Sequence, residues 1–231
     1  MVESSCSMAE GLDGGLCTVF LESLPITGAS ISVFSGLAPE TMVCASNRVS
    51  ARIDELQFDL GEGPRWAALE RRRPVLLPDV RAGSHSAWPV FANAIRDLDV
   101  SALFVFPLVL GAMDIGVAEL YCSVPGALSP ADHSTALQLA DAATWQLLRQ
   151  LLTLAPADGT DAPQDGSPLS RREVHQATGM VLAQTGASAT DALLLLRAHA
   201  FSQGRTVREV ARDVVAKTLD FTPADGVTGH P

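Results

Sequence analysis

Residues 155–168 constrain the fold of this chain more than any other segment does. They contain three prolines, two glycines and three aspartates, and no aromatic residue. This composition is typical of a flexible linker, because it offers neither a hydrophobic face nor a regular backbone. The segment therefore separates a long N-terminal part from a short C-terminal part, and a chain of 231 residues can hold two such domains.

The N-terminal part mixes helical and strand-like patterns. Residues 29–34 alternate between apolar and polar side chains like a half-buried strand, whereas 101–110 and 114–121 are more continuously apolar, as expected for central strands covered on both faces. The expected strands are 29–34, 41–45, 74–77, 101–110 and 114–121. The expected helices are 11–24, 50–56, 64–72, 88–97 and 131–152. This order predicts an α+β fold in which helices flank an antiparallel sheet.

Beyond residue 168 the periodicity is purely helical. We expect helices at 171–184, 188–202 and 206–219. Ser170 with Glu173, and Thr206 with Glu209, have the spacing of a capping box, and Gly186 is suited to end the first of these helices. Three short helices in succession predict a small all-α binding module rather than an enzyme scaffold.

Charge is distributed unevenly along the chain. The formal net charge is −10, with −11 in residues 1–168 and +2 in residues 169–221. The overall acidity disfavours a nucleic-acid surface that extends over the whole chain. It leaves the C-terminal module open to such a role.

The sequence gives no indication of export or of membrane insertion. The first ten residues are polar and acidic, unlike a signal peptide, and the longest apolar run, 102–110, is about half the ~20 residues of a membrane span. The four cysteines form no Cys-x-x-Cys pair; they are Cys6, Cys17, Cys44 and Cys122. We therefore expect a cytoplasmic protein whose thiols are reduced and unlinked.

Two groups of motifs resemble known domains. Asp-Leu-Gly-Glu-Gly-Pro at 59–64, Arg-Pro-Val at 73–75 and Ile-Gly-Val at 115–117 together resemble the GAF sensory domain, in particular that of actinobacterial GAF–ANTAR regulators. Val-His-Gln-Ala-Thr-Gly-Met-Val-Leu at 174–182, with Thr-Val-Arg-Glu-Val-Ala at 206–211, resembles the ANTAR helical module. The resemblance implies a GAF domain at 11–154 and a three-helix ANTAR module at 169–221. We expect the linker at 155–168 to join them and residues 222–231 to form a disordered tail.

The ANTAR resemblance implies RNA binding and transcription antitermination. The family is thought to recognise tandem hairpins as a dimer, which would bring the protein into indirect contact with transcribing RNA polymerase. This chain departs from the family at Thr178, where a lysine is usual, and we expect the hydroxyl to donate a hydrogen bond to RNA instead. The expected RNA-binding residues are Arg171, Arg172, Gln176, Ala177, Thr178, Gly179, Arg197, Arg205 and Arg208.

Two apolar helices favour a homodimer. The four leucines at 193–196 wrap most of one C-terminal helix, and the helix at 131–152 carries a wider apolar stripe than one sheet would cover. A dimer would present two RNA-binding modules and so hold paired hairpins with high avidity.

The GAF resemblance implies a small-molecule pocket on one face of the sheet. The expected lining residues are Phe34, Trp66, Trp88, Phe91, Phe104, Phe106 and Glu119. Lys217 is the only lysine, so the Asn-Lys signature of cyclic-nucleotide-binding GAF domains is missing, and no cysteine adjoins a histidine for bilin attachment. His85 is the one candidate ligand for haem, although a loop histidine of this kind is more commonly an ordinary surface residue. The sequence indicates no metal site and no catalytic group.

These patterns predict a signal-responsive, RNA-binding antitermination regulator rather than an enzyme. One alternative is a DNA-binding three-helix regulator that reads bases with Arg208, Arg212 and Lys217. A second is a GAF-fold methionine sulfoxide reductase, whose thiol pair would be Cys44 and Cys122 because both lie on expected strands. A third is a ligand sensor that acts only on protein partners.

Overall fold

The computed structural model describes residues 15–34, 40–82, 86–154 and 171–222. The chain forms two compact units, Met1–Ser170 and Arg171–Pro231, each of which is described by itself.

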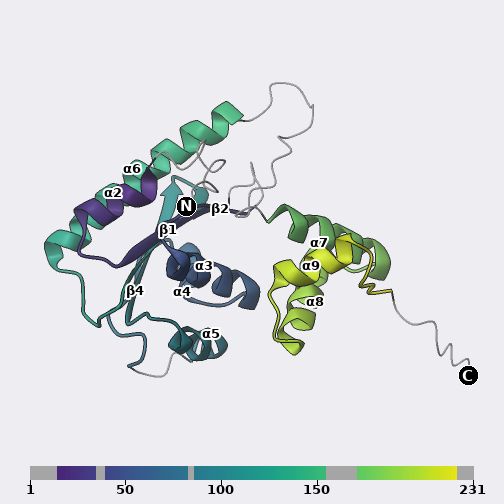
Figure 1. Ribbon diagram of the computed structural model, residues 1–231. Helices are drawn as coiled ribbons and strands as arrows, with labels where there is room; N and C mark the ends of the chain where they lie inside the picture. The colour runs from purple at the N-terminus through teal and green to yellow at the C-terminus, as the bar shows by residue number, and fades with distance from the viewer. Residues whose placement is uncertain (1–14, 35–39, 83–85, 155–170, 223–231) are drawn as a thin grey trace, which may run out of the picture. The chain divides into compact units, whose positions relative to one another are not determined.

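The N-terminal unit is built on a five-stranded sheet (Figure 1). Its strands are β1 (Gly28–Val33), β2 (Thr41–Ala45), β3 (Val75–Leu77), β4 (Ala102–Leu110) and β5 (Met113–Cys122). Its helices are α2 (Leu16–Ser23), α3 (Arg48–Leu60), α4 (Pro64–Arg71), α5 (Pro89–Ala94), the 3₁₀ helix η1 (Ile95–Asp97) and α6 (Pro130–Leu154). The strand order is β2-β1-β5-β4-β3 and every pair is antiparallel. The predicted α+β fold is confirmed.

Two hydrophobic cores lie on opposite faces of this sheet. Helices α2 and α6 cover one face, where Phe104 and Leu147 are buried, and α3, α4 and α5 cover the other, where Ile53 and Val105 are buried (Figure 1). The central strands are therefore covered on both sides, which explains why their sequences are rich in apolar residues.

Gly116 allows the strands β1 and β5 to pair. It lies opposite Val33 in their ladder, and a Cβ atom at this position would lie 2.0 Å from the carbonyl oxygen of Ser32. Glycine avoids this clash with the neighbouring backbone. The Ile-Gly-Val motif at 115–117 is thus explained by strand pairing.

Several predicted helices of this unit differ in length from those observed, among them the one expected at 11–24, which is observed as α2 at 16–23. The helix expected at 50–56 is longer, because the Asn47 side chain accepts a hydrogen bond from the Ser50 N–H at 2.9 Å and starts α3 earlier, while Gly61 ends it in the left-handed conformation. The helix expected at 88–97 ends as α5 at residue 94, and its last turn tightens into η1.

The C-terminal unit is a bundle of three helices: α7 (Arg172–Thr185), α8 (Ala189–Ser202) and α9 (Val207–Val215). One apolar face of each helix is buried; these residues are Val174, Ala177, Val181, Ala192, Leu196, Ala200, Val207, Val210, Ala211 and Val214. The capping box of Thr206 and Glu209 is confirmed. Ser170, expected to form the other capping box, lies outside the described residues; α7 starts one residue later than expected, with Arg171 as its N-cap and no side-chain capping hydrogen bond. Helix α9 ends at 215 rather than 219.

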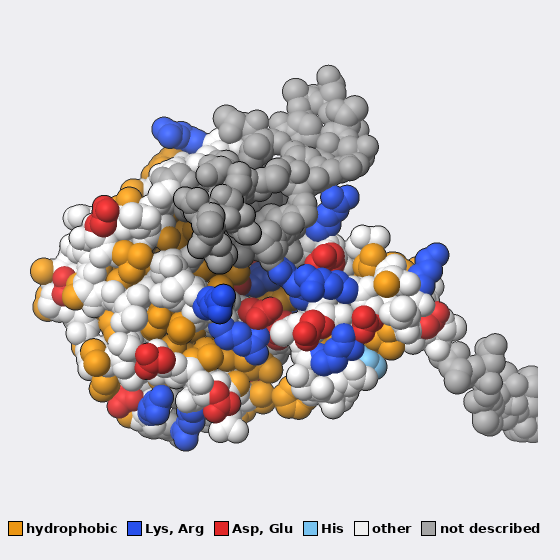
Figure 2. Space-filling model, viewed as in Figure 1, with side chains coloured by type: hydrophobic (Ala, Val, Ile, Leu, Met, Phe, Trp, Pro, Cys, Tyr) orange, Lys and Arg blue, Asp and Glu red, His pale blue; other side chains and the backbone are white. Residues whose placement is uncertain are grey.

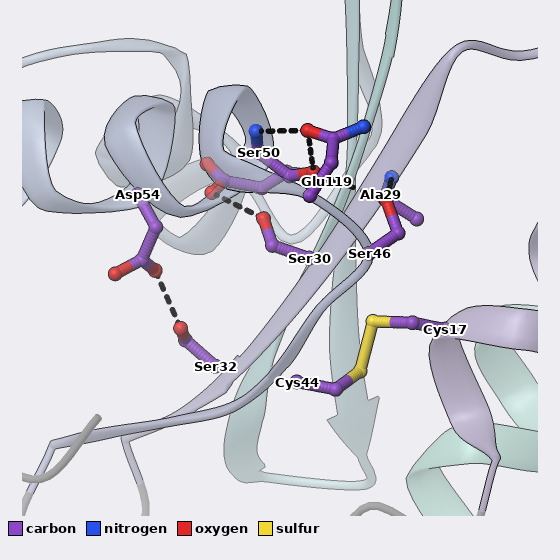
Figure 3. Close-up of a disulfide and its surroundings, with 10 residues drawn as sticks. Cys17, Ala29, Ser30, Ser32, Cys44, Ser46, Ser50, Asp54 and Glu119 are labelled. Carbon is purple, nitrogen blue, oxygen red and sulfur yellow. Dashed lines mark hydrogen bonds between the residues drawn. A yellow bond between two sulfur atoms is a disulfide. The ribbon is translucent and has the colours of Figure 1, made fainter. Parts of the chain in front are cut away.

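A disulfide bond joins Cys17 of α2 to Cys44 of β2 (Figure 3). It corrects the prediction of unlinked thiols. The two cysteines are 27 positions apart in the sequence and meet only because α2 packs across β1 and β2. Cys122 is a free thiol that donates a hydrogen bond to the Pro25 carbonyl at 3.6 Å, and Cys6 lies outside the described residues.

In the part of the chain that the structure describes, no single helix has both the length and the apolar content needed to cross a membrane. Helices α7 and α8 meet that test only as a pair, and they are bent by 105° with respect to each other.

Candidate functional site

A buried polar cluster lies between the sheet and helices α3 and α4. It is termed the Arg65 cluster and consists of Ser30 and Ser32 of β1, Asp54 and Gln57 of α3, Arg65 of α4 and Glu119 of β5, all of them buried. Alternation along β1 directs the two serines away from the α2 side of the sheet, and Glu119 pairs directly with Ser30. Figure 3 shows these serines reaching Glu119 and Asp54.

Arg65 is the centre of this cluster. Its Nη2 donates hydrogen bonds to Asp54 and, at 2.6 Å, to Glu119, to which its Nε also donates at 3.3 Å. Gln57 donates to Glu119 at 2.5 Å and accepts a hydrogen bond from the backbone N–H of Arg65 at 2.9 Å. The Ser32 hydroxyl donates to Asp54 at 2.5 Å. The side chains of two helices and two strands are therefore bonded into one network.

The charges in this network hold Arg65 in its ionised form. Burial by itself would lower the pKa of the guanidinium, but the charges of Asp54 and Glu119 outweigh burial and raise the pKa above its ordinary value. Glu40 adds a third carboxylate, with its Oε1 3.5 Å from Nη1 of Arg65. The side chains of these ion pairs therefore occupy the space between the sheet and helices α3 and α4.

The predicted pocket residues divide between the two faces of the sheet. On the face of the Arg65 cluster lie Phe34, Trp66, Trp88, Phe91 and Glu119. Phe104 and Phe106 lie on the opposite face, in the core beneath α2 and α6. The prediction that all seven line one pocket is wrong, because alternate residues of β4 point to opposite sides of the sheet.

Two of the predicted aromatic residues pack beside the Arg65 cluster. The guanidinium of Arg65 lies 5.4 Å from the ring centroid of Phe34, within the range of a cation–π contact, and the rings of Phe34 and Trp66 are 5.8 Å apart. The indole N–H of Trp66 donates to the Gln57 carbonyl at 3.2 Å. Trp66 thus links α4 to α3, and Phe34 packs against Arg65 and Trp66 of α4.

Phe104 instead lines a cavity of about 170 Å³ on the other face, near the start of α6. Pro25, Cys122 and Leu128 also contribute to its largely apolar wall. Its one acidic residue, Asp132, already accepts a hydrogen bond from the Ser129 hydroxyl at 2.6 Å. Such a lining favours a small apolar molecule over a charged one.

Asp54, Gln57 and Arg65 were not among the predicted site residues. The sequence does carry a signal for the first two, because they interrupt the apolar face that Ile53 and Leu56 give to α3. Within the described residues no group of three histidine, cysteine, aspartate or glutamate side chains is placed to hold a metal ion. The candidate haem ligand, His85, lies outside those residues.

The thiol pair of the reductase alternative is not formed. Cys44 is bonded to Cys17, and Cys122 is a separate free thiol at the end of β5. Burial is the main cause that raises the pKa of Cys122, which keeps this thiol protonated and unreactive near neutral pH.

In the C-terminal unit, α7 presents three of the predicted RNA-binding residues on one face. Arg172, Gln176 and Gly179 are exposed and follow at intervals of four and three residues, so they share one side of the helix. A Cβ atom at Gly179 would meet no described atom within 4 Å, so another molecule can approach the backbone there. Ala177 is buried in the bundle, and its assignment to the RNA-binding surface is wrong because it faces the opposite side of α7.

Thr178 does not play its expected part. Its hydroxyl donates a hydrogen bond to the Val174 carbonyl at 2.7 Å, one turn back along the helix. This bond is a common one for threonine within helices. The hydroxyl proton of Thr178 is therefore already donated within α7, so the prediction that it is donated to RNA is wrong.

The other predicted cations lie at the start of α7, on α8 and near the start of α9. Arg171 precedes α7, and Arg197 and Arg208 are half-buried. Arg205 pairs with Asp213 at 2.7 Å. Basic and acidic side chains are interspersed on the face of this unit that Figure 2 shows, so the cations form no uniform basic patch there.

The base-reading residues of the DNA-binding alternative are poorly placed. Arg212 lies 3.6 Å from Glu173 of α7, and Lys217 lies beyond the end of α9 in the left-handed conformation. Only Arg208 belongs to the first turn of α9. A recognition helix should offer several such side chains along one face.

Comparison with family models finds a GAF domain over residues 16–144, more than half of the chain, followed by an ANTAR domain over residues 168–215. This chain belongs to the GAF–ANTAR family. The predicted architecture is confirmed, and it is that of a signal-responsive regulator, in which a GAF sensor precedes an ANTAR output domain. Comparison with curated proteins gave no match.

Solved structures resemble the GAF domain of this GAF–ANTAR protein. One is a domain of a protein described as a two-component sensor histidine kinase from Sinorhizobium meliloti, with 20% identity, a TM-score of 0.50 and coverage of 64% of this chain and 97% of that one. Another is the GAF domain of a phosphoenolpyruvate-protein phosphotransferase from Coxiella burnetii, with 17% identity, a TM-score of 0.50 and coverage of 62% and 85%. At these identities the likeness concerns the fold alone.

Proposed function

We propose that this GAF–ANTAR protein binds RNA hairpins through α7 and regulates transcription by antitermination. The observation that carries the proposal is the ANTAR domain, whose α7 presents Arg172, Gln176 and Gly179 on one exposed face. Arginine can bind phosphate groups and stack on unpaired bases, and a glycine on the helix surface lets the RNA backbone approach closely. Contact with transcribing RNA polymerase would be indirect, through the nascent transcript that the protein holds.

The functional unit in this proposal is a dimer formed through α6. Leu137, Trp145 and Leu152 are spaced by eight and seven residues, so they share one side of α6, and the last two are 56% and 59% exposed. Val19 of α2, a helix in contact with α6, is also exposed. Large apolar side chains exposed together favour burial against another protein surface, and a second copy would supply an identical one. A signal in the GAF domain would then change the spacing of the two ANTAR domains.

Titration of the full chain against tandem hairpins with hexanucleotide loops tests RNA binding. We expect binding that weakens as salt rises, since it releases counterions from phosphates. Arg172→Gln should weaken it, whereas Arg96→Gln, which removes an exposed charge from the GAF domain, should not.

Absence of salt-sensitive binding at low ionic strength would contradict the proposal. Competition with duplex DNA separates it from the DNA-binding alternative, which predicts that the duplex displaces the hairpin.

The dimer is tested with Trp145→Glu. A charge in the centre of the α6 surface should raise the dimer dissociation constant at least ~10-fold, because aromatic side chains carry much of the energy of such interfaces. Sedimentation velocity measures this constant. Ala112→Glu places the same charge at an exposed position outside α6, in the turn between β4 and β5, and should leave the dissociation constant unchanged. Equal effects of the two substitutions would exclude this surface as the interface.

A further inference from the structure

The disulfide bond fixes a helix that has few other means of holding its position. Helix α2 has eight residues, no side-chain hydrogen bond from its N-cap Gly15 and no acidic residue in its first turn. A helix this short is not stable alone, so its place depends on tertiary contacts. These contacts are the disulfide at Cys17 and the packing of a few apolar side chains, among them Phe20 and Leu24.

The other end of the bond lies at the edge of the sheet. Strand β2 is one of the two edge strands and pairs with β1 alone in the described sheet. Cys44 and Cys17 are both buried, on the α2 and α6 side of the sheet, as Figure 3 shows for the bond and for the adjoining helix. The disulfide therefore joins a short helix to an edge strand, two elements that are each weakly held.

Helix α2 also contacts the helix proposed for dimerisation. It packs beside α6 (Figure 1), on which Trp145 and Leu152 are exposed, and it has an exposed apolar residue of its own, Val19. Release of α2 would uncover the parts of α6 and β1 on which it packs. The opposite face of the sheet, in contrast, holds the Arg65 cluster, whose ion pairs occupy the interior there.

We propose that the GAF domain senses thiol redox state, and that reduction of the Cys17–Cys44 disulfide releases α2 from the sheet. The reductant is a dithiol or two molecules of a monothiol. Its thiolate attacks one sulfur and breaks the protein S–S bond; the protein gains two electrons and two protons as two thiols, and the reductant becomes a disulfide. An oxidised low-molecular-weight thiol reverses the step by the same exchange. Only the output, a changed dimer and changed RNA binding, rests on the proposed function.

Hydrogen exchange of the α2 amides tests the proposal. The double variant Cys6→Ser/Cys122→Ser keeps only the relevant pair, and the matched control adds Cys17→Ala and Cys44→Ala. Both proteins are treated with oxidised glutathione and then measured with and without dithiothreitol. In the protein that keeps the pair, the reductant should speed exchange in 16–23 at least tenfold, while β4 and β5 stay protected. The control should exchange at the fast rate under both conditions.

Several results would overturn the proposal. One is two free thiols per chain after the glutathione treatment, measured with a maleimide after unfolding. A second is an exchange rate in α2 that is the same with and without dithiothreitol. A third is a loss of protection throughout the sheet on reduction, which would mean that the whole domain unfolds. Hairpin affinity of the same samples separates the two ideas: release of α2 without hairpin binding in either state would refute the proposed function and leave the redox response standing.

Discussion

Single side chains set what the interior of the GAF domain can hold. Arg65 is fully buried and bonds both Asp54 and Glu119, so the two carboxylates are neutralised within the chain. In an interior of this kind each ion depends on its partner, because an unpaired buried charge costs several kcal/mol. Arg65 thus stabilises the contact of α3 and α4 with the sheet.

Arg65→Met should therefore lower the free energy of unfolding by about 3–5 kcal/mol, as measured in urea. The matched substitution Arg72→Met breaks a half-exposed pair with Asp114, at 3.2 Å, and should cost less than about 1 kcal/mol. Equal losses in the two variants would show that the cluster is not a coupled unit.

Thr178 is the residue at which this chain departs from its family, and the structure indicates how to restore the usual cation. Because its hydroxyl is used within α7, Thr178→Lys removes no contact that RNA could make with that proton. The substitution should tighten hairpin binding severalfold at low salt and steepen the salt dependence by about 0.7–0.9 in logarithmic slope. Thr190→Lys adds the same charge at an exposed position of α8 and so controls for the change in net charge. An equal gain from both would mean that position 178 does not contact RNA.

At the scale of elements, the start of α9 depends on a local device. The carboxylate of Glu209 accepts hydrogen bonds from the N–H and the hydroxyl of Thr206, at 2.9 and 3.1 Å, while the Glu209 N–H donates back to that hydroxyl. The bonds from the Thr206 backbone and side chain lower the pKa of Glu209 below its ordinary value of 4.5. The helix is thereby fixed at the turn that follows α8.

Thr206→Ala should lower the stability of the ANTAR domain by about 1 kcal/mol at pH 7. Because the pKa of Glu209 is lower in the folded state, its contribution is complete above the unfolded value and is lost as the pH falls through the folded value. The cost of the substitution should therefore shrink below about pH 4. Thermal unfolding of the two proteins, followed by circular dichroism at pH 7 and below about pH 4, measures how the cost of the substitution changes with pH. A cost that does not change with pH would contradict the role given to the Glu209 carboxylate.

At the scale of the whole molecule, the chain is two compact units that should unfold separately. Calorimetry of the full chain should show two transitions. Reduction of the disulfide should lower the unfolding temperature of the GAF transition only. The loss in free energy of unfolding should be about 2–4 kcal/mol, because the bond restricts the unfolded chain. Thr206→Ala should shift only the ANTAR transition. One merged transition, moved by either change, would show that the units are coupled.

The sequence by itself determined the domain order and most of the secondary structure. The helical spacing of the C-terminal unit and the capping box at Thr206 depend on residues a few positions apart, and the strands follow from apolar runs of their own. Local patterns are sufficient for these features because the interactions behind them are local. The family motifs at 59–64 and 174–182 belong to the same class, and the family comparison confirms both domains.

Only the tertiary structure decided which side chains meet. Arg65 reaches Glu119 across 54 positions of the sequence, and Cys17 reaches Cys44 across 27. Phe104 was assigned to the wrong face because the answer depends on register: Val105 lies opposite Glu119, so its neighbours in β4 point the other way. Strand pairing and helix packing bring such residues together after local structure is fixed, and no short stretch of sequence records the outcome.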